Sequence, residues 1–151
     1  MKEFKFDNLA KIDMTTKVNG ILESALYFED LEKAVTFYTD LFGFEILVNT
    51  ERLVALNVAG KQVLLLFKKD SSLSDITLPG GGIIPPHNGS GPVHLAFSID
   101  ADSQDDWKNR LTERNITIES LVQFNDGNSI YFRDTDNHLI ELATPGIWKG
   151  I

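Results

Sequence analysis

The chain has 151 residues, of which 42% are apolar and 24% charged, enough for one domain with its own hydrophobic core. It contains no cysteine, which excludes disulfides, thiol nucleophiles and thiolate zinc sites and leaves histidine and carboxylate side chains as the strong metal ligands. Its net charge of −8 repels phosphate backbones and anionic lipid, so we expect neither a nucleic-acid partner nor a membrane partner.

The N-terminal segment scatters lysines among acidic residues and has no apolar stretch before a small-residue cleavage site, unlike a secretory signal. The longest wholly apolar run, Val63 to Phe67, is far shorter than the roughly 20 residues of a membrane-spanning helix. We therefore predict a cytoplasmic protein with an N-terminal arm over residues 1–19 and a single domain over residues 20–151.

In chain order, the first predicted strand is Ile21 to Phe28, whose residues alternate in character. A helix should begin after Asp30, a residue type that caps helix N-termini, and end at Gly43. Its apolar residues recur at helical spacing, which predicts a face packed on a sheet: Leu31, Ala34, Phe37, Tyr38 and Leu41. Three more strands should follow, at Phe44 to Val48, Leu53 to Val58 and Gln62 to Phe67.

The same order of elements recurs in the second half. Glu23 and His94 are 71 residues apart, and Gly43 and Asn115 are 72 apart, so the offset is nearly constant. This half should begin with a strand at Val93 to Ile99, followed by a helix that begins near Asp102 or Ser103. Three further strands should follow the helix, at Ile116 to Gln123, Ser129 to Phe132 and Leu139 to Ala143.

The sequence thus predicts an α+β fold of two βαβββ modules. Module one covers about residues 20–69 and module two about residues 92–148. Between them, residues 70–91 are rich in proline and glycine, which favours a connector without helix or strand pairing.

An ionisable residue lies on the same face of three of these strands, the face turned away from the helices: Glu23, His94 and Glu141. A carboxylate in an apolar strand is costly unless a cation or a donor meets it. Two carboxylates and an imidazole suit manganese, iron(II), zinc or nickel. We therefore predict one divalent metal site from the three residues; the alternative is that His94 is a hydrogen-bonded core residue.

Other polar residues are weaker candidates for catalytic roles. His87, after two prolines in the connector, is either a base or substrate contact, or an exposed loop residue. Tyr131 and Arg133 share a strand face and could donate to an anionic substrate, unless Arg133 pairs with the nearby Asp134 or Asp136. His138, out of phase with Glu141, is expected at the surface or behind the ligands.

Three stretches between Ile21 and Trp148 resemble the vicinal oxygen chelate superfamily, which includes glyoxalases, bleomycin-resistance proteins and extradiol dioxygenases: LYFEDLEKAVTFYTDLFGFE, GPVHLAFSI and SIYFRDTDNHLIELATPG. The resemblance implies paired modules that form an eight-stranded incomplete barrel, commonly in a homodimer, with a metal in the hollow acting as a Lewis acid. The family's second-module ligands fall on His94 and Glu141. Its first-strand ligand, commonly histidine or glutamine, falls on Glu23.

The resemblance implies a metal-dependent lyase or dioxygenase that chelates vicinal oxygens of a small organic substrate. Glyoxalase members usually carry another carboxylate late in module one, where this chain has Leu64 to Leu66, which weakens a glyoxalase assignment. The alternative function is a metal-free protein that sequesters a drug, as bleomycin-resistance members do, and the acidic net charge favours a cationic ligand.

Overall fold

The structure is a computed structural model that describes residues 16–151, so most of the predicted N-terminal arm lies outside the described residues. The elements of the first half are β1 (Glu23–Phe28), α1 (Leu31–Phe42), β2 (Glu45–Asn49), β3 (Leu53–Val58) and β4 (Gln62–Lys68). A short hairpin, β5 (Ile76–Thr77) and β6 (Ile83–Ile84), follows. The second half contains β7 (His94–Ser98), α2 (Gln104–Glu113), β8 (Ser120–Phe124), β9 (Gly127–Arg133) and β10 (Leu139–Ala143).

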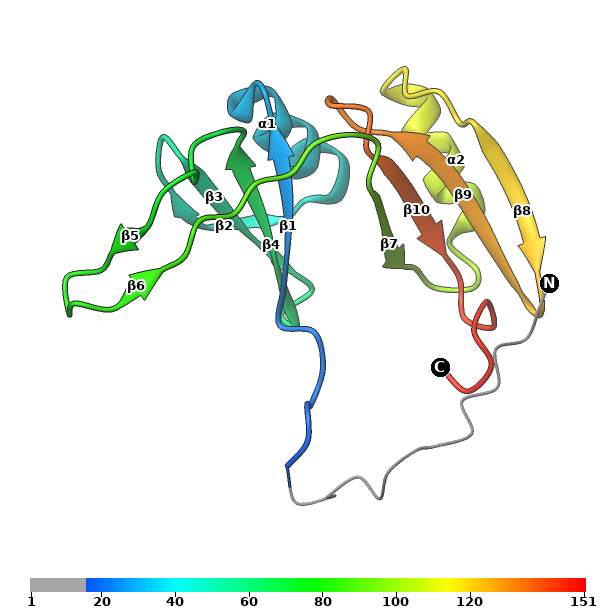
Figure 1. Cartoon of the computed structure of the whole chain (residues 1–151). Helices are drawn as coiled ribbons and strands as arrows, with labels where there is room; N and C mark the ends of the chain where they lie inside the picture. The colour runs from blue at the N-terminus through cyan, green and yellow to red at the C-terminus, as the bar shows by residue number, and fades with distance from the viewer. Residues whose placement is uncertain (1–15) are drawn as a thin grey trace.

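The two halves form four-stranded sheets of identical topology, ordered β1-β4-β3-β2 and β7-β10-β9-β8. In each sheet the strand that comes first in the chain pairs in parallel with the one that comes last, β1 with β4 and β7 with β10. The remaining pairs are antiparallel. Figure 1 shows the sheets side by side, each with its own helix. The predicted α+β fold of two βαβββ modules is confirmed. Within residues 16–151 no strand of one sheet pairs with a strand of the other, so the barrel is not closed.

Helix α1 begins and ends as its sequence predicts. The Asp30 side chain accepts a hydrogen bond from the Lys33 backbone amide, which lowers the pKa of the Asp30 carboxyl. Gly43 ends the helix at φ 70°, a left-handed conformation that glycine adopts without steric cost. The second module departs from its predicted pattern after α2: the Ile116 amide bonds back to the Leu111 carbonyl, so strand β8 begins only at Ser120.

One apolar core joins the helix-facing sides of both modules. Aromatic side chains carry part of that junction, because Phe42 of α1 lies 4.9 Å from Phe97 of β7 and 5.6 Å from Trp107 of α2, between ring centroids. Since the helix-facing sides of the sheets pack into this core, their opposite faces are left to carry the predicted site residues.

A buried polar network also crosses from module one to module two. The Tyr38 hydroxyl donates to Asp134 Oδ2 at 2.8 Å, and His138 Nδ1 lies 2.8 Å from the same oxygen. The other oxygen of Asp134 accepts the backbone amides of Asp136 and His138. Of the two positions predicted for His138, at the surface or behind the ligands, the surface position is wrong: His138 is 3% exposed, because Asp134 folds the β9–β10 turn back into the core.

The connector contains a hairpin that the sequence did not predict. Its strands are only two residues long, and Gly81, at φ 84°, permits the tight turn between them. The base of the hairpin is closed by hydrogen bonds from the His87 amide to the Ser72 carbonyl and from Asn88 Nδ2 to Asp70 Oδ1. The hairpin extends away from the sheets (Figure 1). Neither helix of residues 16–151 has the length and hydropathy needed to span a bilayer.

The first prediction concerns the network between the modules. Replacing Tyr38 with phenylalanine leaves the buried Asp134 carboxylate one donor short, so we expect Tyr38→Phe to lower the free energy of unfolding by about 1–3 kcal/mol, measured in urea. The control is Tyr27→Phe, whose hydroxyl is only half-buried, and which should cost less than about 1 kcal/mol. If the two variants lose equal free energy of unfolding, the network around Asp134 does not stabilise the protein as proposed.

The second prediction is a pH dependence. Burial, and after it the charge of Asp134, raises the pKa of Tyr38 well above its usual value. The unfolded chain releases this proton near pH 10 and the folded chain does not. The stability tied to Tyr38 is therefore complete below about pH 10 and is lost as the pH rises through the folded pKa. Between about pH 9 and 11, the free energy of unfolding measured in urea should fall less steeply with pH for Tyr38→Phe than for the wild type. Parallel slopes of this free energy against pH would refute this account.

Candidate metal-binding site

Parallel pairing of β7 with β10 brings His94 and Glu141 together from positions 47 residues apart. In this register His94 lies opposite Leu139 and Ala96 opposite Glu141, so the two ionisable side chains occupy one face of adjacent strands. His94 Nε2 and Glu141 Oε2 are 3.1 Å apart. Glu141 is 7% exposed, whereas the His94 side chain is 46% exposed and open to a ligand.

The other polar atoms of this pair are already engaged. His94 Nδ1 lies 3.0 Å from the Leu139 carbonyl oxygen, which can only accept, so Nδ1 carries a proton. His94 Nε2 then faces Oε2 of Glu141, a carboxylate oxygen that has only lone pairs to offer. Two acceptors at 3.1 Å are stable only with a cation between them, either a proton or a metal ion. The donor set therefore fits a divalent cation.

Ser129 on β9 completes the support of the carboxylate. It is 1% exposed and its hydroxyl donates to Glu141 Oε1, the oxygen that does not face His94. This hydrogen bond fixes the orientation of the carboxylate. Sequence reasoning missed Ser129, although its place two residues before Tyr131, on the same strand face, could have marked it.

Tyr131 lies directly beside the pair. It is opposite Glu141 in the β9–β10 register, and its ring centroid is 6.1 Å from that of His94. Burial first, and then the neighbouring Glu141, raises the pKa of the Tyr131 hydroxyl. This hydroxyl therefore stays protonated at neutral pH and can donate to an oxygen bound at the site.

Glu23 is not part of this cluster in the single chain. It is an exposed residue at the start of β1, opposite Val63 in the other sheet. Within residues 16–151, no three His, Asp or Glu side chains come close enough together to hold a metal ion. The structure thus unites two of the three predicted ligands and leaves the third on the corresponding face of module one.

The remaining predicted residues lie elsewhere. Arg133 donates to Glu119 Oε1 at 3.0 Å and to the Asn137 carbonyl at 3.2 Å, so it holds β9 to its neighbours, with a partner other than Asp134 or Asp136. His87 lies in the connector, beside module one, where the Tyr27 hydroxyl is 2.7 Å from its Nδ1. The connector folds against β1 and β4 there, so His87 is half-buried against Phe67.

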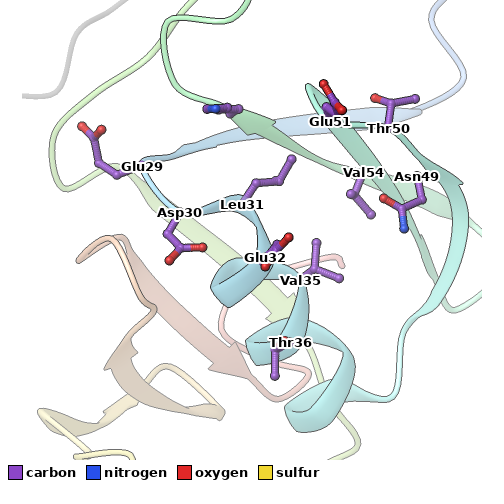
Figure 2. A pocket seen from close by; sticks show the side chains of 11 residues that line it. Glu29, Asp30, Leu31, Glu32, Val35, Thr36, Asn49, Thr50, Glu51 and Val54 are labelled. Carbon is purple, nitrogen blue, oxygen red and sulfur yellow. The ribbon is translucent and has the colours of Figure 1, made fainter.

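A wide pocket of about 940 Å³ lies in module one, between the start of α1 and the β2–β3 turn (Figure 2). Its lining is rich in acidic residues, among them Glu29, Asp30, Glu32 and Glu51. None of the predicted metal ligands lines it, and no histidine does. We therefore place the candidate site at His94 and Glu141, where the donor chemistry is, and not in this pocket.

Comparisons with known proteins agree with this geometry. A family model described as "Glyoxalase/Bleomycin resistance protein/Dioxygenase superfamily" matches residues 17–142. A "Metallothiol transferase FosB" of Staphylococcus haemolyticus is 30% identical over 129 residues, 84% of each chain. The structure of a "Lactoylglutathione lyase from Agrobacterium tumefaciens" matches with a TM-score of 0.80 and 33% identity, over 89% of this chain and 99% of that chain.

A more distant structure has the same fold. It is the "fosfomycin resistance protein, FosX, from Listeria monocytogenes complexed with MN(II) and sulfate ion". It matches with a TM-score of 0.64 and 24% identity, over 85% of this chain and 91% of that chain.

The third prediction tests the support of the carboxylate. Ser129→Ala leaves the buried Oε1 of Glu141 without its donor and should lower the free energy of unfolding of the metal-free protein by about 1–3 kcal/mol. The control is Ser98→Ala, an exposed serine on β7, which should change stability by less than about 0.5 kcal/mol. If Ser129→Ala is as stable as the wild type, the Glu141 carboxylate does not depend on this hydroxyl.

Proposed function

Because the chain belongs to the glyoxalase/bleomycin resistance protein/dioxygenase superfamily, we propose that it is a metal-dependent enzyme that binds a small organic substrate through two neighbouring oxygens. The observation that carries this proposal is the His94–Glu141 pair, in which Nε2 of a side chain open to ligands and Oε2 of a buried carboxylate are 3.1 Å apart. A protein that only encloses a ligand has no need of such a pair.

Manganese, iron(II), zinc and nickel all accept one imidazole and two carboxylates. When bound, such a cation acts as a Lewis acid and polarises the substrate oxygens. His94 and Glu141 would hold it, with Ser129 fixing the carboxylate and the Leu139 carbonyl fixing the imidazole. Tyr131, protonated beside the pair, would donate a hydrogen bond to an anionic oxygen of the substrate.

We propose that the third ligand comes from a homodimer, in which Glu23 of the partner subunit faces His94 and Glu141. The edge strands β2 and β8 support this arrangement, since every residue of both is exposed. Their exposed side chains include large apolar ones, which a monomer would leave in water: Ile46, Leu47, Val48, Leu121, Val122 and Phe124. A second copy would cover them and bring a module-one face to a module-two face.

The reaction type follows from what module one lacks. Leu65 lies beside Ala25 on the strand face that carries Glu23, while Leu64 and Leu66 point into the core. Strand β4 therefore offers no carboxylate to act as a fourth ligand and proton shuttle, which disfavours a lactoylglutathione lyase. The relatives named "Metallothiol transferase FosB" are, by that name, transferases that use a metal and a thiol. We favour a metal-dependent transferase with a thiol co-substrate over a lyase or a dioxygenase.

A metal-free protein that sequesters a cationic drug is the second candidate. The net charge of −8 and the acidic pocket beside α1 favour it. If the protein sequesters a drug, calorimetric titration with bleomycin should release heat, and replacing His94 and Glu141 should not change that heat. If it is the metal-dependent enzyme, its activity should require both residues.

The fourth prediction tests the ligand set by calorimetric titration of the metal-stripped full-length protein with Mn²⁺. His94→Ala and Glu141→Gln should each weaken binding by at least about a hundredfold, and Glu23→Ala by about tenfold or more. Glu113→Ala, at the exposed end of helix α2, removes the same charge as Glu23→Ala and should bind as the wild type does.

Two results would overturn the proposal. The first is a wild-type protein that binds no divalent cation. The second is unchanged affinity in His94→Ala and Glu141→Gln. If only Glu23→Ala binds like the wild type, the metal site stands and the contribution of the partner subunit is refuted.

A further inference from the structure

A second cluster of polar groups surrounds the ring of Phe67 at the opposite end of β1 from Glu23. Tyr27 pairs with Phe67 in register, and their rings stack with centroids 5.6 Å apart. The edge of His87 meets Phe67 at 4.6 Å, and the Arg52 guanidinium carbon lies 5.4 Å from the centroid of the same ring. We call these residues, with Ser72, the Phe67 cluster. They come from β1, β4, the β2–β3 turn and the connector.

The cluster is built rigidly. Arg52 Nη1 donates to the Ser72 hydroxyl at 2.8 Å, and Ser72 is 3% exposed. The carbonyl of Ser72 accepts the His87 amide at 2.9 Å, so one buried serine anchors both basic residues. Gly89 lies so close to the Tyr27 ring that a Cβ at this position would clash with it, so the connector backbone packs directly against this face. The two basic side chains are therefore held in place before any ligand arrives.

Among residues 16–151, the charge of Arg52 has no acidic partner. In a chain of net charge −8, none of the acidic side chains in residues 16–151 forms a salt bridge with it. Only one of its five N–H groups, on Nη1, donates to a described acceptor. A half-buried guanidinium, stacked on an aromatic ring and with free donors, is suited to receive an anion in bidentate geometry.

His87 adds a hydrogen-bonding group. Burial raises the pKa of the Tyr27 hydroxyl. That hydroxyl and His87 Nδ1 form a hydrogen bond at 2.7 Å. When the hydroxyl donates, the imidazole proton lies on Nε2, which has no acceptor among the described residues. Arg52 and His87 thus both offer unused N–H groups around one ring.

We propose that the Phe67 cluster is an anion-binding site that takes the carboxylate or phosphoryl group of a small organic molecule. Arg52 supplies the charge, His87 a hydrogen bond, and Tyr27 an aromatic surface for an apolar part of the same ligand. The site shares the strand face of Glu23, four residues or about 13 Å along β1. That the anion is part of the substrate rests on the proposed function; the binding of the anion itself does not.

The test is a titration of the EDTA-treated full-length protein with phenylphosphonate, followed by the NMR signal of the Arg52 side-chain Nε–H and by calorimetry. We expect saturable binding in the millimolar range or tighter and a shift of the Arg52 signal. Benzoate should bind at the same place and benzyl alcohol, which lacks the charge, should not. Binding of phenylphosphonate without benzoate would restrict the ligand to phosphoryl groups.

Arg52→Gln should weaken phenylphosphonate binding by about tenfold or more, the usual effect of losing a charged hydrogen-bond donor. The matched control is Lys68→Gln, which removes the same charge from the exposed residue next to Phe67 and should bind as the wild type does. Arg52→Lys keeps the charge without the forked donors and should bind between the two. Because Arg52→Gln also releases Ser72, His87→Ala serves as a second variant, with an expected loss of about threefold to tenfold.

The proposal fails if the wild type shows no saturable binding, or if Arg52→Gln and Lys68→Gln weaken binding equally, which would reflect overall charge only. It also fails if neither Arg52→Gln nor His87→Ala changes the affinity. Titration with Mn²⁺ separates this result from the proposed function. Arg52→Gln should bind Mn²⁺ as the wild type does, and Glu141→Gln should retain phenylphosphonate.

Discussion

Parallel pairing of the first and last strands of each module is the constraint on which the rest of the structure depends. It places Glu141 beside His94 in the second sheet, and it places Phe67 beside Tyr27 in the first. The helix between these strands covers one face and commits it to the core, so polar residues on the other face remain free for ligands. Because both modules follow the same rule, the chain carries two comparable open faces that differ only in their side chains.

The two modules are joined by a core that contains a buried polar network around Asp134. Asp134 is 8% exposed and accepts hydrogen bonds from Tyr38 of α1 and from the backbone of its own turn. A buried carboxylate is tolerable only when donors surround it, and here they come from both modules. The β9–β10 turn that Asp134 closes leads directly into Leu139, whose carbonyl orients His94. The contact between modules and the orientation of the candidate ligand thus share one segment.

Local patterns in the sequence predicted the elements, because capping, periodicity and the repeated offset are properties of short stretches. The cap at Asp30, the stop at Gly43 and the shared face of His94 and Glu141 are of this kind. The burial of His138 could not be predicted, since it depends on how its turn folds against module one. Nor could the partner of Arg133, since it depends on how the segment between α2 and β8 lies along β9. Glu23 marks the same limit: alternation gives the face of a side chain, but the distance between two sheets is set by packing that no single strand encodes.

The Phe67 cluster and the His94–Glu141 pair occupy different modules and present opposite chemistry, unused N–H donors in one and convergent lone pairs in the other. A molecule with an anionic group and a pair of neighbouring oxygens would satisfy both, provided that a module-one face meets a module-two face. Within residues 16–151 of one chain, no third histidine or carboxylate joins His94 and Glu141. In the proposed homodimer, the contact that covers the apolar edges of β2 and β8 would also bring the donors and the acceptors to the same substrate.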